Sequence, residues 1–162
     1  MKILSEFTVD ISTLKKIKLA IPETKLEFNE YFYLRYKVLR EPWKQPEGSE
    51  KDEGDETSYH VCLLHRHMMV GVCRMQINSA DEAQIRYMAV HELYRGENLG
   101  VVMLSYFERM AREKGIDTMI LQARETAVKF YARNGYEVVE KTFLLFNEIQ
   151  HYLMKKNLVK VV

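Results

Sequence analysis

Apolar residues recur at helical spacing between residues 99 and 111, and this is the clearest periodic segment of the chain. One face of the predicted helix carries Leu99, Val102, Met103, Tyr106, Phe107, Met110 and Ala111. The opposite face carries Glu108, Arg109, Arg112 and Glu113. Lys114-Gly115 follows directly, a pair typical of a helix C-terminus. The pattern predicts an amphipathic helix that packs one face against a core.

Start and stop signals predict two further helices. Thr24 and Glu27 match a capping box, so a helix is expected from about residue 27 to 40, where Pro42 ends it. A shorter helix is expected over 125–133, and one side of it carries Ala127, Phe130 and Tyr131.

Strand-like apolar runs occupy the segments 16–21, 59–64, 68–77, 84–91, 117–121, 136–146 and 149–153. The short turns near 65–67 and 78–82 imply antiparallel hairpins. The helix between the runs 84–91 and 117–121 implies a right-handed crossover and a parallel pair. The chain is therefore predicted to be α+β, with a mixed, mostly antiparallel sheet and one parallel step.

Length and composition favour one soluble domain over residues 1–162. Of the 162 residues, 47% are apolar and 29% charged, and the net charge is +1, so neither nucleic acid nor an anionic membrane is an expected partner. No signal peptide and no apolar run of roughly 20 residues is evident, which predicts a cytoplasmic protein. Cys62 and Cys73 lie in apolar runs and are expected to be reduced, buried thiols, a catalytic thiol being the alternative.

The turn Arg95-Gly96-Glu97-Asn98-Leu99-Gly100 carries the candidate chemistry. It lies between an apolar strand and the start of the amphipathic helix. Helix-start amides and the helix dipole offer partial positive charge there, and Arg95 adds a full one. The turn is therefore predicted to bind a phosphate or pyrophosphate group.

Two motifs together resemble the GNAT superfamily of N-acetyltransferases, over residues from about 16 to 157. The first joins Tyr87-Met88-Ala89-Val90 to the turn Arg95–Gly100 and resembles the family's acetyl-CoA motif. The second runs from Leu121-Gln122-Ala123-Arg124 through Ala127 to Phe130-Tyr131-Ala132-Arg133-Asn134-Gly135-Tyr136. Their order and spacing make the resemblance specific. It implies a three-layer arrangement, with helices on both faces of the sheet.

The resemblance also implies a set of site residues. Acetyl-CoA, as co-substrate, would place its pyrophosphate on the backbone amides of Arg95, Gly96, Glu97, Asn98, Leu99 and Gly100. Its pantetheine arm would lie along Met88, Ala89 and Val90, and the later motif would contribute Ala127 and Phe130. Tyr131 matches the position that commonly protonates the leaving thiolate. The alternative for Tyr131 is a core aromatic residue with its hydroxyl at the rim.

One residue of the turn departs from the family pattern. Asn98 occupies a position usually held by glycine. Asparagine is the next most tolerant residue for unusual backbone angles, so we expect the turn to be preserved. The departure bears on how closely a pyrophosphate approaches at this residue.

The segment 41–56 is polar and aperiodic. It holds seven carboxylates against two lysines, together with Trp43, the only tryptophan. A charge run of this kind is usually a solvated, mobile loop, which is the reading we favour here. The alternative is an acidic lip that attracts a cationic acceptor. A weaker likeness to a subgroup of bacterial GNAT proteins rests on Leu34, Arg35, Val38, Asp52, Asp55, His60, Gly71 and Arg74.

The predicted activity is transfer of an acetyl group from acetyl-CoA to a primary amine of a small molecule or peptide. Candidates for the general base are His60, His91, Glu82 and the loop carboxylates. No metal is assigned, because His65 and His67 lack a third ligand. The alternative function is an acyl-CoA-binding or sensing module without turnover. The protein is expected to be a monomer or homodimer, and residues 152–162 could complete the sheet or pair with a partner chain.

Overall fold

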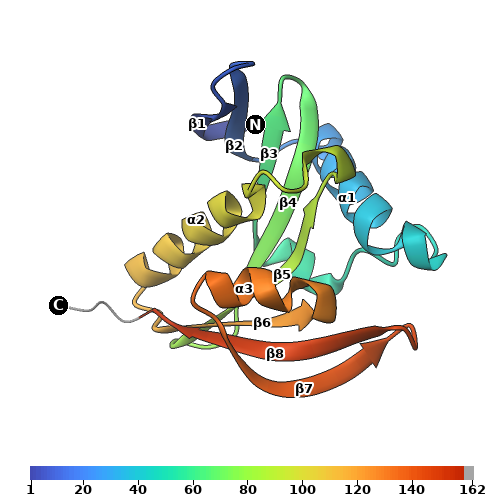
Figure 1. Ribbon diagram of the computed structural model, residues 1–162, viewed down its shortest axis with the longest axis vertical. Helices are drawn as coiled ribbons and strands as arrows, with labels where there is room; N and C mark the ends of the chain where they lie inside the picture. The colour runs from blue at the N-terminus through green and yellow to red at the C-terminus, as the bar shows by residue number, and fades with distance from the viewer. Residues whose placement is uncertain (159–162) are drawn as a thin grey trace. The chain divides into compact units, whose positions relative to one another are not determined.

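The computed structural model describes residues 1–158 and contains an eight-stranded sheet (Figure 1). The strand order is β1-β2-β3-β4-β5-β6-β8-β7. Strands β5 and β6 pair in parallel, whereas β1–β2, β2–β3, β6–β8 and β7–β8 pair antiparallel. The predicted α+β fold class, with its parallel step, is confirmed.

The helices and strands follow one another along the chain in a mixed order. They are β1 (Lys2–Asp10), β2 (Lys15–Ile21), α1 (Lys25–Leu39), η1 (Glu41–Trp43), η2 (Glu53–Glu56), β3 (Tyr59–His65), β4 (Met68–Ile77), β5 (Glu82–Val90), η3 (Glu92–Tyr94), α2 (Leu99–Glu113), β6 (Thr118–Arg124), η4 (Glu125–Ala127), α3 (Val128–Arg133), β7 (Glu137–Leu145) and β8 (Ile149–Asn157). The chain divides into two compact units, and β4 and β5 contribute residues to both.

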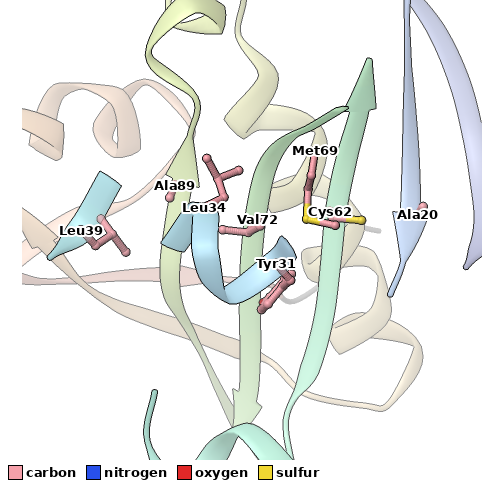
Figure 2. Packing of buried hydrophobic residues seen from close by; sticks show 8 residues of the cluster. All are labelled: Ala20, Tyr31, Leu34, Leu39, Cys62, Met69, Val72 and Ala89. Carbon is pink, nitrogen blue, oxygen red and sulfur yellow. The ribbon is translucent and has the colours of Figure 1, made fainter. Parts of the chain in front are cut away.

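The first unit comprises Met1–Arg74 and Tyr87–Ser105. Its core cluster gathers side chains of α1 and the strands, as Figure 2 shows: Ala20, Tyr31, Leu34, Leu39, Cys62, Met69, Val72 and Ala89. Helix α1 begins with the predicted capping box. The Thr24 side chain accepts a hydrogen bond from the Glu27 amide, and the Glu27 carboxylate accepts one from the Thr24 amide. The cap starts the helix that carries the core residues.

The second unit comprises Met75–Arg86 and the described residues from Tyr106 onward. Met119 and Leu121 of β6 are buried, and so are Met154 of β8 and Phe107 of α2. Strand β8 lies between β6 and β7 in the sheet. Gly115, after α2, has a φ of +78°, and Gly135, after α3, has a φ of +93°. Both predicted glycine stops therefore adopt the left-handed conformation that ends a helix.

The structure corrects the predicted elements at two places. The strand β1 was missed, because Lys2–Asp10 lies at the edge of the sheet with a mostly exposed burial pattern and no clean alternation. The predicted helix over 125–133 starts as the 3-10 turn η4 and becomes α-helical only from Val128. Up to Asn157 the C-terminal segment completes the sheet as part of β8, and 159–162 lie outside the described residues.

Candidate functional site

The connection from β5 to α2 has two residues in the left-handed conformation. Gly96 has a φ of +85° and Asn98 a φ of +58°. The Asn98 carbonyl then accepts the Val101 amide at 3.2 Å at the start of α2. Left-handed residues in a turn can direct neighbouring backbone amides to one side, a geometry suited to anions. The expectation that Asn98 tolerates unusual backbone angles is confirmed.

Two charged side chains of this turn differ in their surroundings. Arg95 is exposed, and its Nε lies 3.4 Å from the Val90 carbonyl oxygen. Glu97 is half-buried and forms an ion pair with Lys15 of β2, with 2.7 Å between Nζ and Oε1. The same ammonium lies 4.4 Å from the centre of the Tyr94 ring. The partner of Glu97 comes from 82 residues away, so no local sequence signal could have identified it.

The second half of β5 contains an unexpected backbone state. Tyr87 has a φ of +54°, which is rare for a bulky residue inside a strand. It directly precedes Met88, Ala89 and Val90, the segment predicted to lie along pantetheine. Ala89 is buried in the core of the first unit, whereas Met88 and Val90 are half-buried. A left-handed residue changes the direction of the following peptide, as in a β-bulge.

Two buried arginines of the first unit are paired with aspartates of the loop before β3. Arg35 Nη1 lies 3.0 Å from Asp55 Oδ1, and Arg74 Nη1 lies 3.1 Å from the same oxygen. Arg74 Nη1 also lies 2.5 Å from Asp52 Oδ1. Gly54 sits so close to the Arg74 guanidinium that any side chain there would collide with it. We call Arg35, Arg74, Asp52 and Asp55 the ionic cluster.

The ionic cluster corrects the interpretation of segment 41–56 as a solvated, mobile loop. Arg35 is fully buried and Arg74 is 1% exposed, so each needs a carboxylate partner to offset lost hydration. Glu50 is buried as well, and it accepts the Gly48 amide at 2.7 Å. The loop is therefore folded onto the first unit, and only part of its negative charge faces solvent.

His60 belongs to the same buried region. Its Nε2 lies 2.7 Å from the Asp55 carbonyl oxygen and its Nδ1 lies 2.8 Å from the Tyr31 hydroxyl. A carbonyl only accepts, so Nε2 donates to Asp55, whereas Nδ1 faces a hydroxyl that also lies 3.0 Å from the Cys73 carbonyl oxygen. Burial lowers the pKa of His60, which favours the neutral ring. Both ring nitrogens are hydrogen-bonded within the fold, which argues against His60 as the general base.

The other candidate bases are held by local contacts. His91 Nδ1 accepts the Leu93 amide at 3.1 Å and so caps η3, as a turn residue would. Glu82 Oε2 accepts the Asn78 side-chain amide at 2.9 Å. Of the two histidines near the β3–β4 turn, His67 is exposed as expected. His65 is half-buried, and its Nδ1 lies 2.5 Å from the Tyr94 hydroxyl.

In the second unit the residues of the later motif lie around α3. Tyr131 is buried, at 8% exposure, with its ring centre 5.0 Å from that of Phe130 and 5.8 Å from that of Tyr136. The Tyr136 hydroxyl donates to Glu108 Oε2 at 2.8 Å, and Lys156 pairs with the other oxygen of this carboxylate. Ala127 is half-buried at the start of α3. The catalytic role of Tyr131 remains a prediction.

The two cysteines are free and buried. Burial raises the pKa of the Cys62 thiol to about 12 and raises that of Cys73 as well, so neither forms a thiolate readily. Within residues 1–158, no group of three or more His, Cys, Asp or Glu side chains lies in a position to hold a metal ion. No helix in the described part of the chain is long and apolar enough to cross a membrane.

Comparison with known proteins bears directly on these motifs. A family model described as an acetyltransferase (GNAT) domain matches residues 33–158. A Bacillus subtilis relative named uncharacterised N-acetyltransferase YjcF is 26% identical over 141 residues, covering 87% of this chain and 100% of the relative.

Solved structures share the fold at low identity. An aminoglycoside 6'-N-acetyltransferase complexed with coenzyme A aligns with a TM-score of 0.73 at 14% identity, over 89% of this chain and 98% of that one. The ribosomal-protein-S18-alanine N-acetyltransferase from Escherichia coli aligns with a TM-score of 0.70 at 15% identity, over 90% and 96%. Because the family model covers most of the chain, the chain belongs to the GNAT family and is an acetyl-CoA-dependent N-acetyltransferase.

Proposed function

We propose that the enzyme transfers the acetyl group of acetyl-CoA to a primary amine of a small molecule or a peptide. The observation that carries the proposal is the left-handed pair Gly96 and Asn98 at the start of α2. Amides of Arg95 through Gly100 then bind the CoA pyrophosphate, and the exposed Arg95 guanidinium supplies a full positive charge.

The pantetheine arm lies along Met88, Ala89 and Val90 in this proposal. An extended arm can hydrogen-bond to a strand backbone as an added strand does. The thioester carbonyl then accepts a hydrogen bond from a backbone N–H of this stretch. That bond strengthens as the amine attacks, because negative charge develops on the carbonyl oxygen in the transition state.

The amine nitrogen forms a bond to the thioester carbonyl carbon, and the tetrahedral intermediate then expels the CoA thiolate. Tyr131, in contact with Phe130, donates its phenolic proton to that thiolate sulfur. The attacking nitrogen loses its proton to solvent or to a base. Ala127 and Phe130 contribute apolar surface against the cofactor.

The acceptor class is inferred from the chemistry of relatives with the same fold. One of them is named an aminoglycoside 6'-N-acetyltransferase, and the other is named a ribosomal-protein-S18-alanine N-acetyltransferase. Amines of both small molecules and peptides are therefore candidate acceptors. Glu47, Glu53 and Glu56 remain exposed on the loop before β3, although Asp52 and Asp55 are paired with arginines. These exposed carboxylates support a preference for cationic amines.

Release of free CoA thiol from acetyl-CoA, measured with a panel of cationic and neutral amines at low and high salt, tests the proposal. Tyr131→Phe should lower kcat about 100-fold, the lower end of general acid–base contributions, with the dissociation constant for CoA nearly unchanged. Tyr33→Phe is the matched control, because Tyr33 is a 59% exposed phenol on α1.

Three outcomes would count against parts of this proposal. Tight CoA binding without turnover of any amine would indicate a binding module instead of an enzyme. Full activity of Tyr131→Phe would remove the assigned general acid. Equal rates for neutral and cationic amines, independent of salt, would remove the preference for a cationic acceptor.

A further inference from the structure

Tyr87 is held in a backbone state that its side chain disfavours. A φ of +54° is left-handed, where the Cβ of any residue other than glycine is crowded by the backbone. Such residues persist only when the surrounding structure holds them, and they gather at functional sites. Tyr87 is in β5, immediately before Met88, so the cause of its conformation bears on the proposed thioester site.

The Tyr87 side chain is bound on its hydroxyl and along its ring. The hydroxyl donates to Asp52 Oδ2 at 3.0 Å. The Arg35 guanidinium carbon lies 4.3 Å from the ring centre, and that of Arg74 lies 5.3 Å from it. A cation over an aromatic face is attracted by the ring quadrupole. The phenol is therefore anchored by three members of the ionic cluster.

The ionic cluster is itself a rigid support. Arg35 Nη1 donates to both the Asp55 carboxylate and the Glu50 carbonyl at 3.0 Å, and Arg35 is fully buried. The Asp55 carboxylate also accepts the Asp52 amide at 2.9 Å. This last bond fixes the backbone of the residue that binds the Tyr87 hydroxyl. Rotation of the phenol would leave charged groups with fewer partners at a poorly hydrated site.

We infer that Tyr87 is a positioning residue, whose hydrogen bond to Asp52 and contact with Arg35 hold the left-handed kink that orients the backbone amides of Met88–Val90 toward the thioester carbonyl. The inference rests on the proposed function of that strand. It gives the loop before β3 a specific role. Asp52 belongs to the ionic cluster, and its hydrogen bond to Tyr87 connects this cluster to the backbone just before Met88–Val90. A misdirected amide would polarise the carbonyl less in the transition state.

Tyr87→Phe tests the inference, because it removes one hydroxyl and keeps the ring. We expect kcat/KM for acetyl-CoA to fall about tenfold through kcat, less than the roughly 100-fold cost of removing such a donor altogether. The dissociation constant for CoA and the melting temperature should stay close to wild type. Infrared spectra of bound, carbonyl-labelled acetyl-CoA should show a smaller downshift of the thioester stretch than wild type. Tyr33→Phe again serves as the matched control.

The outcomes separate this inference from the function it rests on. If wild type neither binds CoA nor consumes acetyl-CoA, the proposed function fails and the inference fails with it. If wild type is active and Tyr87→Phe matches it in kcat and in the carbonyl stretch, only the inference fails. The inference also fails if kcat falls solely in proportion to lost folded protein, since a structural role alone would explain that.

Discussion

Gly96 and Asn98 share left-handed backbone angles in one turn, although only the first is a glycine. Asparagine reaches this region because its short polar side chain tolerates it better than other side chains. Asn98 therefore adopts a left-handed angle at the position where it departs from the family pattern. Tyr87 reaches the same region for a different reason, because its side chain is held by Asp52 and Arg35.

The backbone angle of Asn98 leads to a stability prediction. Asn98→Ala should lower the free energy of unfolding by about 1 kcal/mol, because a Cβ without a compensating polar group is disfavoured at φ +58°. Asn98→Gly should stay within about 0.5 kcal/mol of wild type, because glycine adopts this angle without strain. Urea unfolding measures both variants. Equal stability of the alanine and glycine variants would contradict the prediction.

At the scale of elements, the β1–β2 hairpin is linked to the β5–α2 turn by one ion pair. Lys15 starts β2, and its ammonium lies 2.7 Å from the Glu97 carboxylate within the turn. A carboxylate in a turn that is proposed to bind pyrophosphate would repel the ligand if it were unpaired. Lys15 offsets that charge, so an edge hairpin contributes to the electrostatics of the candidate cofactor site.

Removal of this lysine should weaken cofactor binding. Lys15→Met should raise the dissociation constant for CoA about fivefold, since one uncompensated charge at this range is worth about 1 kcal/mol. Calorimetry at low salt measures the change. Lys16→Met is the control, because Lys16 is exposed and its ammonium lies 4.0 Å from the exposed Glu6 carboxylate.

A double variant sharpens the result. Lys15→Met combined with Glu97→Gln should bind CoA nearly as well as wild type, because both charges of the pair are then absent. No difference between Lys15→Met and wild type at low salt would argue against a pyrophosphate next to Glu97.

At the scale of the whole molecule, one buried polar region unites distant segments of the first unit. Arg35 comes from α1, Asp55 from η2, His60 from β3 and Arg74 from β4. Buried charges of this kind stabilise a fold only when each keeps its partners. The region therefore acts as a polar core beside the apolar cluster around Tyr31.

Asp55 is the residue on which this polar core depends most. Asp55→Ala should lower the free energy of unfolding by about 3–5 kcal/mol, because it leaves Arg35 buried without its carboxylate and removes one partner of Arg74. Urea unfolding checks the value. Glu53→Ala, which removes an exposed carboxylate of the same turn, should change the stability by less than about 0.5 kcal/mol.

The sequence by itself determined most of the helices and strands, and it indicated the family. Local signals were sufficient for α2, for the capping box at Thr24 and for the parallel pair of β5 with β6, because periodicity and capping act over a few residues. The edge strand β1 was not predicted, because its residues are mostly exposed and do not alternate between apolar and polar. The motif residues proposed for the site also come from the sequence, and their assignment to the site remains a prediction.

Only the tertiary structure decided how the charges pair. The sequence displayed Asp52 and Asp55 as part of an acidic run, yet both face arginines that lie about 20 residues away in the chain. The pairing of Lys15 with Glu97 and the kink at Tyr87 were equally hidden. Such contacts depend on which elements the fold brings together, and a buried charge selects its partner by proximity and desolvation, neither of which is encoded in local sequence.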